Sequence, residues 1–587
     1  SWINLATLYL ESNKIGNKGA AALSTNTSWK NLQHLNLADN QFEAVGVREL
    51  GKNQGWKKLI VLDLTENKIG EGGLSEISRN ENWPKLEVLN LAKNKLNDED
   101  MTTLSQNNVW CGLRELDISN NAIDDAGAIV LSKNDAWKSL EVINLERNFI
   151  KAHGVKNLSA NESWKNIRAL NLNNNPIGAE GAGFLSQAVW TNLETLELVW
   201  SQLGAAGAQK LSRNKSWVKL KNLNLSENAI GDKGATELST NTIWAQLEKL
   251  NLQSNWIGNS GIAELIKNKT WTKLKELNLQ NNSIGDARIA DLGQNAVWTE
   301  LRALYLGWNS VGDAGIISLS QSKIFPNLEE ISLQGNRFGL EGVLALSKNT
   351  SWKKLKAINL TNSSITVQGA TALSENTTWV EIEALELGSS PGSTKNNIET
   401  SGIKALSQNS AWKCLRSLNL KSNMIHSEGV VELSRMISCK NIRTLNLADN
   451  AIGDQGVAIL SSNENFIGLQ VLDLQGNMIS ALGAKELAMN ATWVDLKVLN
   501  LQENTISDDG AAHLSRYTCW VNLVELNLAK NSIGEKGAGA LGENITWKKL
   551  EKLNLRGNQI SSEGAKALAR NITWSNLREL DLFNNNS

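Results

Sequence analysis

The hydrophobic positions of the chain recur with a spacing of 27 residues in most of its repeats. Each period reads W-x-x-L-x-x-L-x-L-x-x-N-x-I-G-x-x-G-A-x-x-L-S-x-N, and its opening position occurs 22 times. In the period that starts at Trp29, the residues Leu32, Leu35 and Leu37 alternate as in a short strand with one buried face. A fixed period of this length predicts a solenoid, in which each repeat is one supersecondary unit that packs against its neighbours.

The polar and small residues of the period predict its other elements. An Asn that follows the strand, such as Asn40, recurs in 19 of the 22 repeats. Its buried amide is expected to bond turn backbone, so that stacked copies form a ladder. The residues Gly19 to Leu23 predict a short helix, and Asn26 is expected to cap that helix in the left-handed conformation. The periodic Trp is expected to form a stacked column at one edge of the core, with Phe325 and Phe466 as replacements.

A strand, a turn and a helix within one such period resemble the leucine-rich repeat, and in particular its ribonuclease-inhibitor-like class. Similar repeats occur in Ran GTPase-activating proteins, NACHT-type immune receptors and effectors of intracellular bacteria. The resemblance implies an α/β fold with one solenoid over residues 1–587 and a parallel sheet on the concave inner face. Strands stack about 4.8 Å apart and helices about 8 Å apart, which predicts a horseshoe, a nearly closed ring or a shallow superhelix.

Departures from the repeated pattern identify candidate binding residues, because scaffold residues should recur. The strand position between the second and third Leu is Asn or Asp in 17 repeats, and Ser201, Ser363 and Ser390 interrupt the Asn ladder. Three tryptophans lie outside the period, and a six-residue insertion falls near residues 390–397. Trp200 and Trp308 are expected four strands apart, about 19 Å. The candidate partner-binding residues are Glu197, Trp200, Ser201, Trp256, Tyr305, Trp308, Glu386 and Lys395.

Exposed aromatic side chains beside isolated carboxylates are typical of protein-binding hot spots. We therefore expect a non-enzymatic interaction scaffold that binds a partner protein through the concave face and rim of repeats 8–15. An alternative interpretation is drift in a long array, with Trp256 and Trp308 folded back onto their turns. Two other functions stay open: self-association, head to tail through terminal repeats that lack polar caps, and regulation of a GTPase or another nucleotide switch.

Composition and charge narrow the class of partner. Lys and Arg total 59 and Asp and Glu total 60, so no net charge favours nucleic acid. The chain lacks a run of about 18 apolar residues, which argues against membrane insertion. Its four His and four Cys residues lack metal-ligand spacing, so we expect no metal, no cofactor and no catalysis. The few Cys residues favour the cytoplasm, with secretion or delivery as an effector as the alternative; the N-x-[ST] triplets follow mostly from the helix-ending motif.

Overall fold

The computed structural model describes residues 2–295, 297–390, 392, 395–516 and 519–585. The chain divides into two compact units, one of residues 1–284 with 295–301 and one of residues 285–294 with 302–587. In each unit, short strands alternate with helices of about two turns, as the periodic pattern predicts. The central residue of most strands is a buried Leu or Ile, which explains why three residues suffice for each strand.

The strands of the first unit are β1 (Thr7–Tyr9), β2 (His34–Asn36), β3 (Val61–Asp63), β4 (Val88–Asn90), β5 (Glu115–Asp117), β6 (Val142–Asn144), β7 (Ala169–Asn171), β8 (Thr195–Glu197), β9 (Asn222–Asn224), β10 (Lys249–Asn251) and β11 (Glu276–Asn278). Its helices are α1 (Gly16–Ser24), α2 (Ala44–Gly51), α3 (Ser75–Arg79), α4 (Asp98–Ser105), α5 (Asp125–Leu131), α6 (Ala152–Ala160), α7 (Gly178–Leu185), α8 (Gly204–Ser212), α9 (Gly231–Ser239) and α10 (Asn259–Leu265).

The second unit begins with α11 (Asp286–Asn295). Its strands are β12 (Ala303–Tyr305), β13 (Glu330–Ser332), β14 (Ala357–Asn359), β15 (Ala384–Glu386), β16 (Ser417–Asn419), β17 (Thr444–Asn446), β18 (Val471–Asp473), β19 (Val498–Asn500), β20 (Glu525–Asn527), β21 (Lys552–Asn554) and β22 (Glu579–Asp581). Its other helices are α12 (Asp313–Gln321), α13 (Leu340–Ser347), α14 (Val367–Ser374), α15 (Glu399–Ser407), α16 (His426–Leu433), α17 (Gly453–Ser462), α18 (Ala481–Met489), α19 (Ser507–Arg516), α20 (Glu535–Gly542) and α21 (Ser562–Ala569), with the short 3₁₀ helices η1 (Ile437–Asn441) and η2 (Glu464–Phe466).

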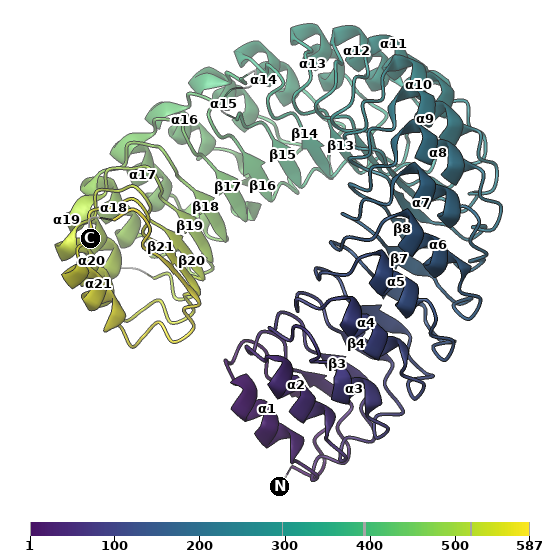
Figure 1. Cartoon of the computed structure of the whole chain (residues 1–587). Helices are drawn as coiled ribbons and strands as arrows, with labels where there is room; N and C mark the ends of the chain where they lie inside the picture. Colours follow the sequence, from purple (N-terminus) through teal and green to yellow (C-terminus); the bar gives the residue numbers. More distant parts are fainter. Residues whose placement is uncertain (1, 296, 391, 393–394, 517–518, 586–587) are drawn as a thin grey trace. The chain divides into compact units, whose positions relative to one another are not determined.

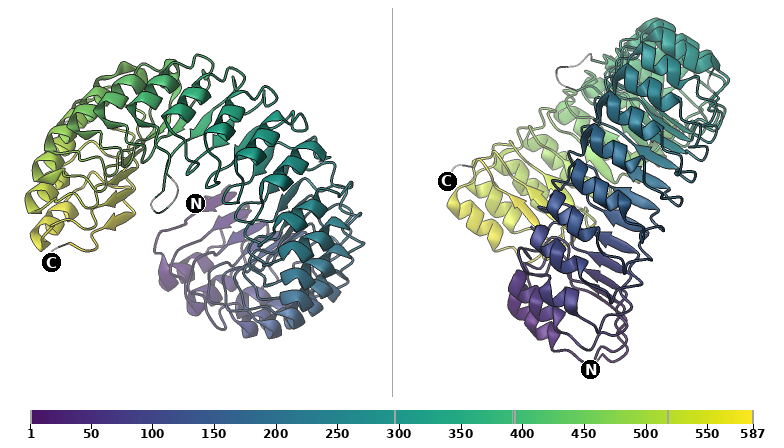
Figure 2. Two further views of the ribbon diagram at one scale, coloured as in Figure 1. Left: turned by 90° about the horizontal axis from the view of Figure 1, so that it is seen from above. Right: turned by 45° about the vertical axis from the view of Figure 1, so that its right-hand side comes forward.

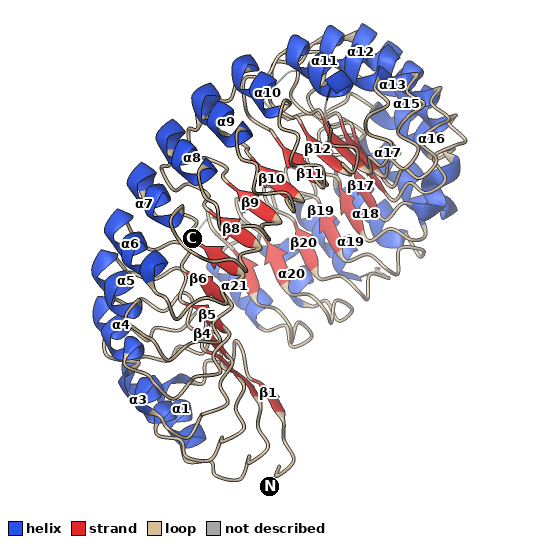
Figure 3. Ribbon diagram, turned by 90° about the vertical axis from the view of Figure 1, so that its right-hand side faces the viewer, coloured by secondary structure: helices blue, strands red, loops and turns tan. Residues whose placement is uncertain are grey.

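Within each unit, every strand pairs in parallel with the strand of the next repeat. The register joins equivalent positions, such as Leu196 with Leu223. The helices form a row along one face of each sheet and leave the other face, which we call the open face, without helices (Figures 1 and 3). Figure 2 shows the helices of the first unit side by side in a single layer. The predicted closure of the whole solenoid stays a prediction.

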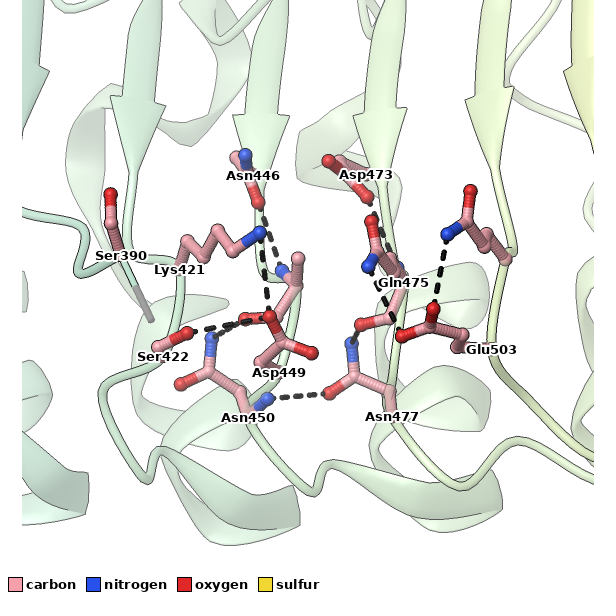
Figure 4. Close-up of polar contacts among 12 residues, drawn as sticks. Ser390, Lys421, Ser422, Asn446, Asp449, Asn450, Asp473, Gln475, Asn477 and Glu503 are labelled. Carbon is pink, nitrogen blue, oxygen red and sulfur yellow. Dashed lines mark hydrogen bonds and ion pairs between the residues drawn. The ribbon is translucent and has the colours of Figure 1, made fainter. Parts of the chain in front are cut away.

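The Asn residues that follow the strands form the predicted ladder, which we call the turn ladder. Asn450 is fully buried. Its Nδ2 donates to the carbonyl oxygens of Leu420, Leu447 and Ala448 at 2.9 to 3.0 Å, and its Oδ1 accepts from the backbone N–H of Asn423 at 2.8 Å. The N–H of Asn450 in turn donates to the Oδ1 of Asn477 (Figure 4). Each amide therefore satisfies backbone groups of its own repeat and of the preceding one.

Repeat 15 corrects one part of this prediction, because the turn ladder is not interrupted at Ser390. Asn396, six residues further on, is buried and takes the ladder position. Its Nδ2 donates to the carbonyl oxygens of Leu360 and Leu387, both at 2.9 Å, and its Oδ1 accepts from the N–H of Ser363 at 3.0 Å. The insertion therefore precedes the ladder residue, and only Ser201 and Ser363 replace the amide among the described repeats.

The prediction of a left-handed cap at Asn26 was wrong. The equivalent residues Asn80 and Asn161 have φ angles of −73° and −68°. These residues form a second ladder, which we call the loop ladder, at the loop between helix and strand. Asn134 is typical: its Nδ2 donates to the carbonyl oxygens of Ser105 and Asn107 in the preceding repeat, and its Oδ1 accepts from the N–H groups of residues 136 and 137. The amide points into the stack, so the backbone stays extended at this residue.

Aspartates in the first helical turn connect successive helices. The Oδ1 of Asp313 accepts from the N–H groups of Gly339 and Gly342 in the next repeat, both at 2.7 Å. A Cβ at Gly342 would lie 2.9 Å from that oxygen, so the second Gly of the repeated motif permits this close approach. Because helix N-termini have unpaired N–H groups and a positive dipole end, each Asp stabilises the start of the next helix. Asp125, Asp232, Asp454 and Asp508 make the same contacts.

The periodic tryptophans form the predicted column in the core. The rings of Trp217 and Trp244 stack with centroids 6.5 Å apart and planes 14° apart. Phe325 and Phe466 occupy the same position and are equally buried. Most of the buried indole N–H groups have no hydrogen-bond acceptor among the described residues. The column is therefore held by apolar contact rather than by the polar atom of the indole.

Candidate functional site

The Asn and Asp residues that end the strands belong to the scaffold. In all 17 repeats that carry one, the side-chain oxygen accepts from the backbone N–H two residues further on. This bond closes an Asx turn, which explains why the type of residue recurs on an exposed surface. Repeats with another residue at this position are therefore free to present a different side chain to a partner.

Repeat 8 replaces this residue with Glu197. The N–H of Val199 donates instead to the Oδ1 of Asn173 in the preceding repeat, at 2.6 Å. Glu197 is half-buried on the open face, and its Oε2 accepts from the Nδ2 of Asn224 at 2.8 Å. Burial raises the pKa of the Glu197 carboxyl, and the hydrogen bonds from Asn224 and Asn173 oppose that shift. The side chain is thus held in place and faces a polar surface.

The three additional tryptophans occupy a strained part of the turn. The residues on either side of the turn-ladder position often have positive φ angles. Trp200 and Trp308, which precede that position, both have a φ of 55°, and Trp256, which follows it, has a φ of 58°. Only Gly, and to a lesser degree Asn and Asp, adopt this conformation readily. In other repeats Asn120, Asn174 and Asn281 fill the position of Trp200, and Glu66, Lys93, Arg147 and Glu227 fill it at similar φ. A residue other than Gly, Asn or Asp costs about 1 kcal/mol there, and the tryptophans share this cost with the charged residues of other repeats.

Trp200 lies at the mouth of a shallow cavity in the first unit. Its side chain is 62% exposed. The cavity has a volume of about 420 Å³ and is lined by Trp200, Gln202, Gly204, Glu227, Asn228 and Ala229. Trp256, two repeats further along the same unit, is 75% exposed. Two strands separate these side chains by roughly 10 Å along the stack, so one partner segment can contact both.

Tyr305 and Trp308 lie in the second unit. Tyr305 is half-buried at the end of β12 and pairs in register with Ser332, which is buried. Trp308 is 43% exposed. Its ring lies over Gly335 of the next repeat, where an added Cβ would be 2.5 Å from the ring. Trp308 is thus partly folded back onto a neighbouring turn, whereas Trp256 is not. The predicted separation of Trp200 and Trp308 stays a prediction, because the two residues belong to different units.

The remaining candidates have different surroundings. Ser201 is fully buried, with its Oγ directed to the carbonyl oxygens of Leu172 and Val199, so it cannot contact a partner. This part of the predicted site was wrong, because a residue that breaks the ladder is still inside the turn. Glu386 is half-buried on β15, and Lys395 is exposed within the insertion. Ser390 is exposed, and its N–H donates to the Oδ1 of Asn362 at 2.7 Å.

Two features of the surface escaped the sequence analysis. Phe149 and Met478 occupy the position of Trp256 in their repeats and are 60% and 62% exposed. Exposed apolar residues at this position therefore also occur outside repeats 8–15, which an alignment of all the repeats shows. The second feature is a cavity of about 560 Å³ near Trp190, where the repeat that begins at Trp164 is one residue shorter than the standard period.

The open face carries polar networks. In Figure 4, the Nζ of Lys421 lies 3.4 Å from the carboxylate of Asp449, which also accepts from the Oγ of Ser422. Burial raises the pKa of the neighbouring Asp473 carboxyl, while the Lys421 charge opposes the shift. Among the residues that the structure describes, no three His, Cys, Asp or Glu side chains gather as metal ligands would.

A family model agrees with this architecture. The model described as "Leucine Rich repeat" matches more than half of the chain, at residues 3–24, 30–51, 57–78, 84–105, 112–132, 165–186, 191–212, 218–239, 246–265, 272–287, 299–320, 326–347, 413–434, 438–461, 495–515, 521–542 and 548–569. The chain belongs to the leucine-rich repeat family. Its assignment to the ribonuclease-inhibitor-like class stays a prediction.

Several solved structures are similar to this leucine-rich repeat chain. The plant peptide hormone receptor RGFR1, in complex with RGF2, is 18% identical, with 95% of this chain and 90% of that chain covered and a TM-score of 0.35. PEPR1 with AtPEP1 is 17% identical, with 96% and 83% covered and a TM-score of 0.36. The ectodomain of the Arabidopsis receptor kinase HAESA, in complex with a peptide hormone, is 18% identical, with 96% and 88% covered and a TM-score of 0.38. At this level the similarity says nothing about the ligand of this chain.

No curated protein matches the chain in sequence. Throughout the part of the chain that the structure describes, the helices are too short or too polar to cross a membrane.

Proposed function

We propose that this leucine-rich repeat chain is a non-enzymatic recognition protein that binds a partner protein through its open face and the adjoining turns. The contact residues are Trp200 and Trp256 in the first unit, with Glu197 beside them, and Tyr305, Trp308, Glu386 and Lys395 in the second. End-to-end self-association and regulation of a nucleotide switch stay predictions. The observation that carries the proposal is the position of the three tryptophans: exposed side chains at turn residues of positive φ.

Physical reasoning favours a functional origin of these residues over drift. Positive φ is common at these turn positions, where Glu66, Lys93 and Arg147 also adopt it, so it does not set the tryptophans apart. What sets them apart is a large aromatic ring that recovers little free energy by burial within the chain. A buried Trp in a protein interface is worth about 2 kcal/mol or more. A partner that covers these rings would therefore supply the burial that the chain itself does not provide. Regular stacking of the repeats provides an extended and rigid surface, so binding does not pay the entropy cost of ordering the backbone that carries these contacts.

Site-directed photo-crosslinking tests the proposal. A photoreactive p-benzoylphenylalanine replaces Gln202, which lines the cavity beside Trp200, and in a matched variant it replaces Arg213 at the exposed end of α8. In extracts of the source cells, we expect one discrete protein adduct from position 202 and none from position 213. Equal adduct patterns from both positions, or no adduct from 202, would contradict the proposed surface.

We also propose that the chain folds in the cytoplasm. Several N-x-[ST] triplets contain loop-ladder residues, such as Asn214 and Asn544. Both are 1% exposed, and their Nδ2 atoms donate to the carbonyl oxygens of Ser186 and Ser515. Glycosylation modifies the same nitrogen, so a glycan at these sites would remove the ladder bonds.

Forced secretion tests this compartment. The chain is expressed behind a signal peptide in a eukaryotic host, with cytoplasmic expression as the reference. We expect glycosylated, misfolded protein from the secretory route and folded protein from the cytoplasm. The variant Ser216→Ala removes one triplet and keeps Asn214, so it should restore the local ladder. Folded protein with a glycan on Asn214 would overturn the proposal.

A further inference from the structure

Three repeats carry a Glu directly before the turn-ladder residue, and only two of these carboxylates have a cation. The Oε2 of Glu66 lies 2.9 Å from the Nζ of Lys93, and the Oε1 of Glu503 lies 2.7 Å from the Nζ of Lys530. Each Lys occupies the same position as its Glu, one repeat further along. Glu227 is the third member of this set, and its surroundings differ.

The two neighbours of Glu227 in this column carry no charge. Ser254 takes the place of the Lys in the next repeat, and its Oγ accepts from the Nδ2 of Asn281 at 2.8 Å. Trp200 takes the same place in the preceding repeat. In the part of the chain that the structure describes, no Lys, Arg or His pairs with the Glu227 carboxylate. An exposed carboxylate therefore lies one repeat from an exposed indole ring.

The ring of Trp200 and the side chain of Glu227 line the same cavity of about 420 Å³. None of the six residues that line this cavity is basic. An added Cβ at Gly204, another of the six, would meet no atom within 4 Å, so the space there is open. Successive repeats are roughly 5 Å apart at the strands, so one small planar group can contact both the ring and the carboxylate.

We propose that this cavity binds the guanidinium group of an Arg side chain from the partner polypeptide. The assignment rests on the proposed function, because the same Trp200 contacts the partner there. The face of an indole ring attracts a cation, and a carboxylate accepts hydrogen bonds from it. The ligand would supply to Glu227 the positive charge that Lys93 and Lys530 supply to the equivalent glutamates.

Other side chains fit this pair of groups less well. A planar guanidinium stacks on an aromatic ring and keeps its N–H groups directed at a carboxylate, whereas the ammonium of Lys is a compact point charge. An acidic group would be repelled by Glu227. A purely apolar group would remove water from the carboxylate without replacing its hydrogen bonds. The combination of ring and unpaired carboxylate therefore favours Arg.

Fluorine NMR of protein labelled with 5-fluorotryptophan tests the assignment, with the Trp200 signal identified from the Trp200→Phe variant. The peptide acetyl-Ala-Arg-Ala-methylamide is compared with the same peptide carrying citrulline, the neutral isostere of Arg. We expect a saturable shift of the Trp200 signal with Arg and about fivefold weaker binding with citrulline. Free methylguanidinium should also bind more weakly than the Arg peptide; equal binding would overturn the assignment to a polypeptide ligand.

Two variants make the test independent of the peptides. Glu227→Gln removes the charge and keeps the shape, and Ser254→Lys places a Lys where Lys93 stands beside Glu66. Both should weaken binding of the Arg peptide about fivefold. Glu66→Gln is the matched control and should leave that binding unchanged. No saturable shift with Arg, equal binding of Arg and citrulline, or unaltered affinity in both variants would overturn the inference.

Crosslinking from position 202 separates this assignment from the proposed function. If the wild-type protein forms its discrete adduct but does not prefer the Arg peptide, only the guanidinium assignment fails. If no adduct forms, the proposed partner surface fails whatever the peptides show.

Discussion

Asn228 allows the energetic role of the turn ladder to be worked out and tested. Its amide is 2% exposed and makes five hydrogen bonds. Nδ2 donates to the carbonyl oxygens of Leu198, Leu225 and Ser226 at 2.6, 3.0 and 3.0 Å. Oδ1 accepts from the N–H groups of Ser201 and Leu203 at 3.0 and 3.2 Å. The substitution Asn228→Ala removes all five and leaves buried backbone groups without partners.

The expected loss follows from the cost of a buried hydrogen bond. A net contribution of about 1 kcal/mol for each bond gives a loss of about 3–5 kcal/mol, after allowing for water that reaches some of the freed groups. The reverse change is Ser201→Asn in the preceding repeat. Ser201 makes only two long contacts, at 3.4 and 3.3 Å, and the N–H of Ile177 donates locally to the carbonyl oxygen of Asn175 instead. An Asn at 201 should therefore stabilise the turn by about 1–2 kcal/mol.

Hydrogen exchange measured by mass spectrometry is the suitable assay, because repeat proteins open locally and a global midpoint averages over many repeats. In peptides that cover residues 198–230, Asn228→Ala should reduce protection by a factor of a hundred or more, and Ser201→Asn should increase it. Asn166→Ala, at an exposed Asn of the same unit, is the matched control and should change little. A loss below about fivefold for Asn228→Ala, or reduced protection in Ser201→Asn, would refute the reasoning.

Three further predictions concern the core, the pH dependence and the second unit. In urea unfolding, Trp244→Phe should lower the free energy of unfolding by less than about 1.5 kcal/mol and Trp244→Ala by about 3–5 kcal/mol. The difference is expected because the indole N–H has no acceptor and Phe fills this place in two repeats; equal losses would contradict an apolar column. Burial raises the pKa of Asp100 from 3.8 to about 6, and the N–H groups of Asn97 and Gly72 oppose the shift. The unfolded chain ionises this carboxyl more readily, so stability should fall by about 1–2 kcal/mol as the pH rises from about 4 to 6 and then stay level; a pH profile unaltered in Asp100→Asn would show that another group is responsible. Gly335→Ala should destabilise the second unit by about 1–2 kcal/mol more than Gly557→Ala. Both glycines have similar positive φ, but only Gly335 lies under the ring of Trp308. Equal thermal unfolding of the two variants would show that the ring moves away and would contradict this expectation.

The repeated residues made most of the fold predictable, because each copy of the period confirms the others. Strands, helices, the turn ladder and the Trp column all follow from one consensus and elementary rules of burial. Asn26 was misassigned because an Asn after a helix suits both a left-handed cap and an Asx turn. The distinction depends on carbonyl groups of the neighbouring repeat, which a single period does not display.

The site was less predictable, because departures from a consensus do not reveal which way a side chain points. Trp200 and Ser201 are neighbours in sequence, yet one is 62% exposed and the other fully buried. Asn396 was missed because the ladder residue was located by its distance from the strand, which the insertion changes. The cavity near Trp190 was missed because a spacing of 26 between two tryptophans differs by only one residue from the period. Exposure and backbone angles had to come from the structure.

The most direct test of the proposed recognition surface measures affinity and stability together in one variant. Trp200→Asn combined with Trp256→Gln introduces residue types that equivalent turns carry at positive φ, Asn174 and Gln41 among them. With the crosslinked partner as ligand, we expect affinity to fall at least 30-fold while the free energy of unfolding stays level or rises by about 1 kcal/mol; Phe149→Ala, as the control, should change neither. Unchanged affinity, or a clear loss of stability in the double variant, would contradict the claim that Trp200 and Trp256 serve to bind a partner rather than to stabilise the fold.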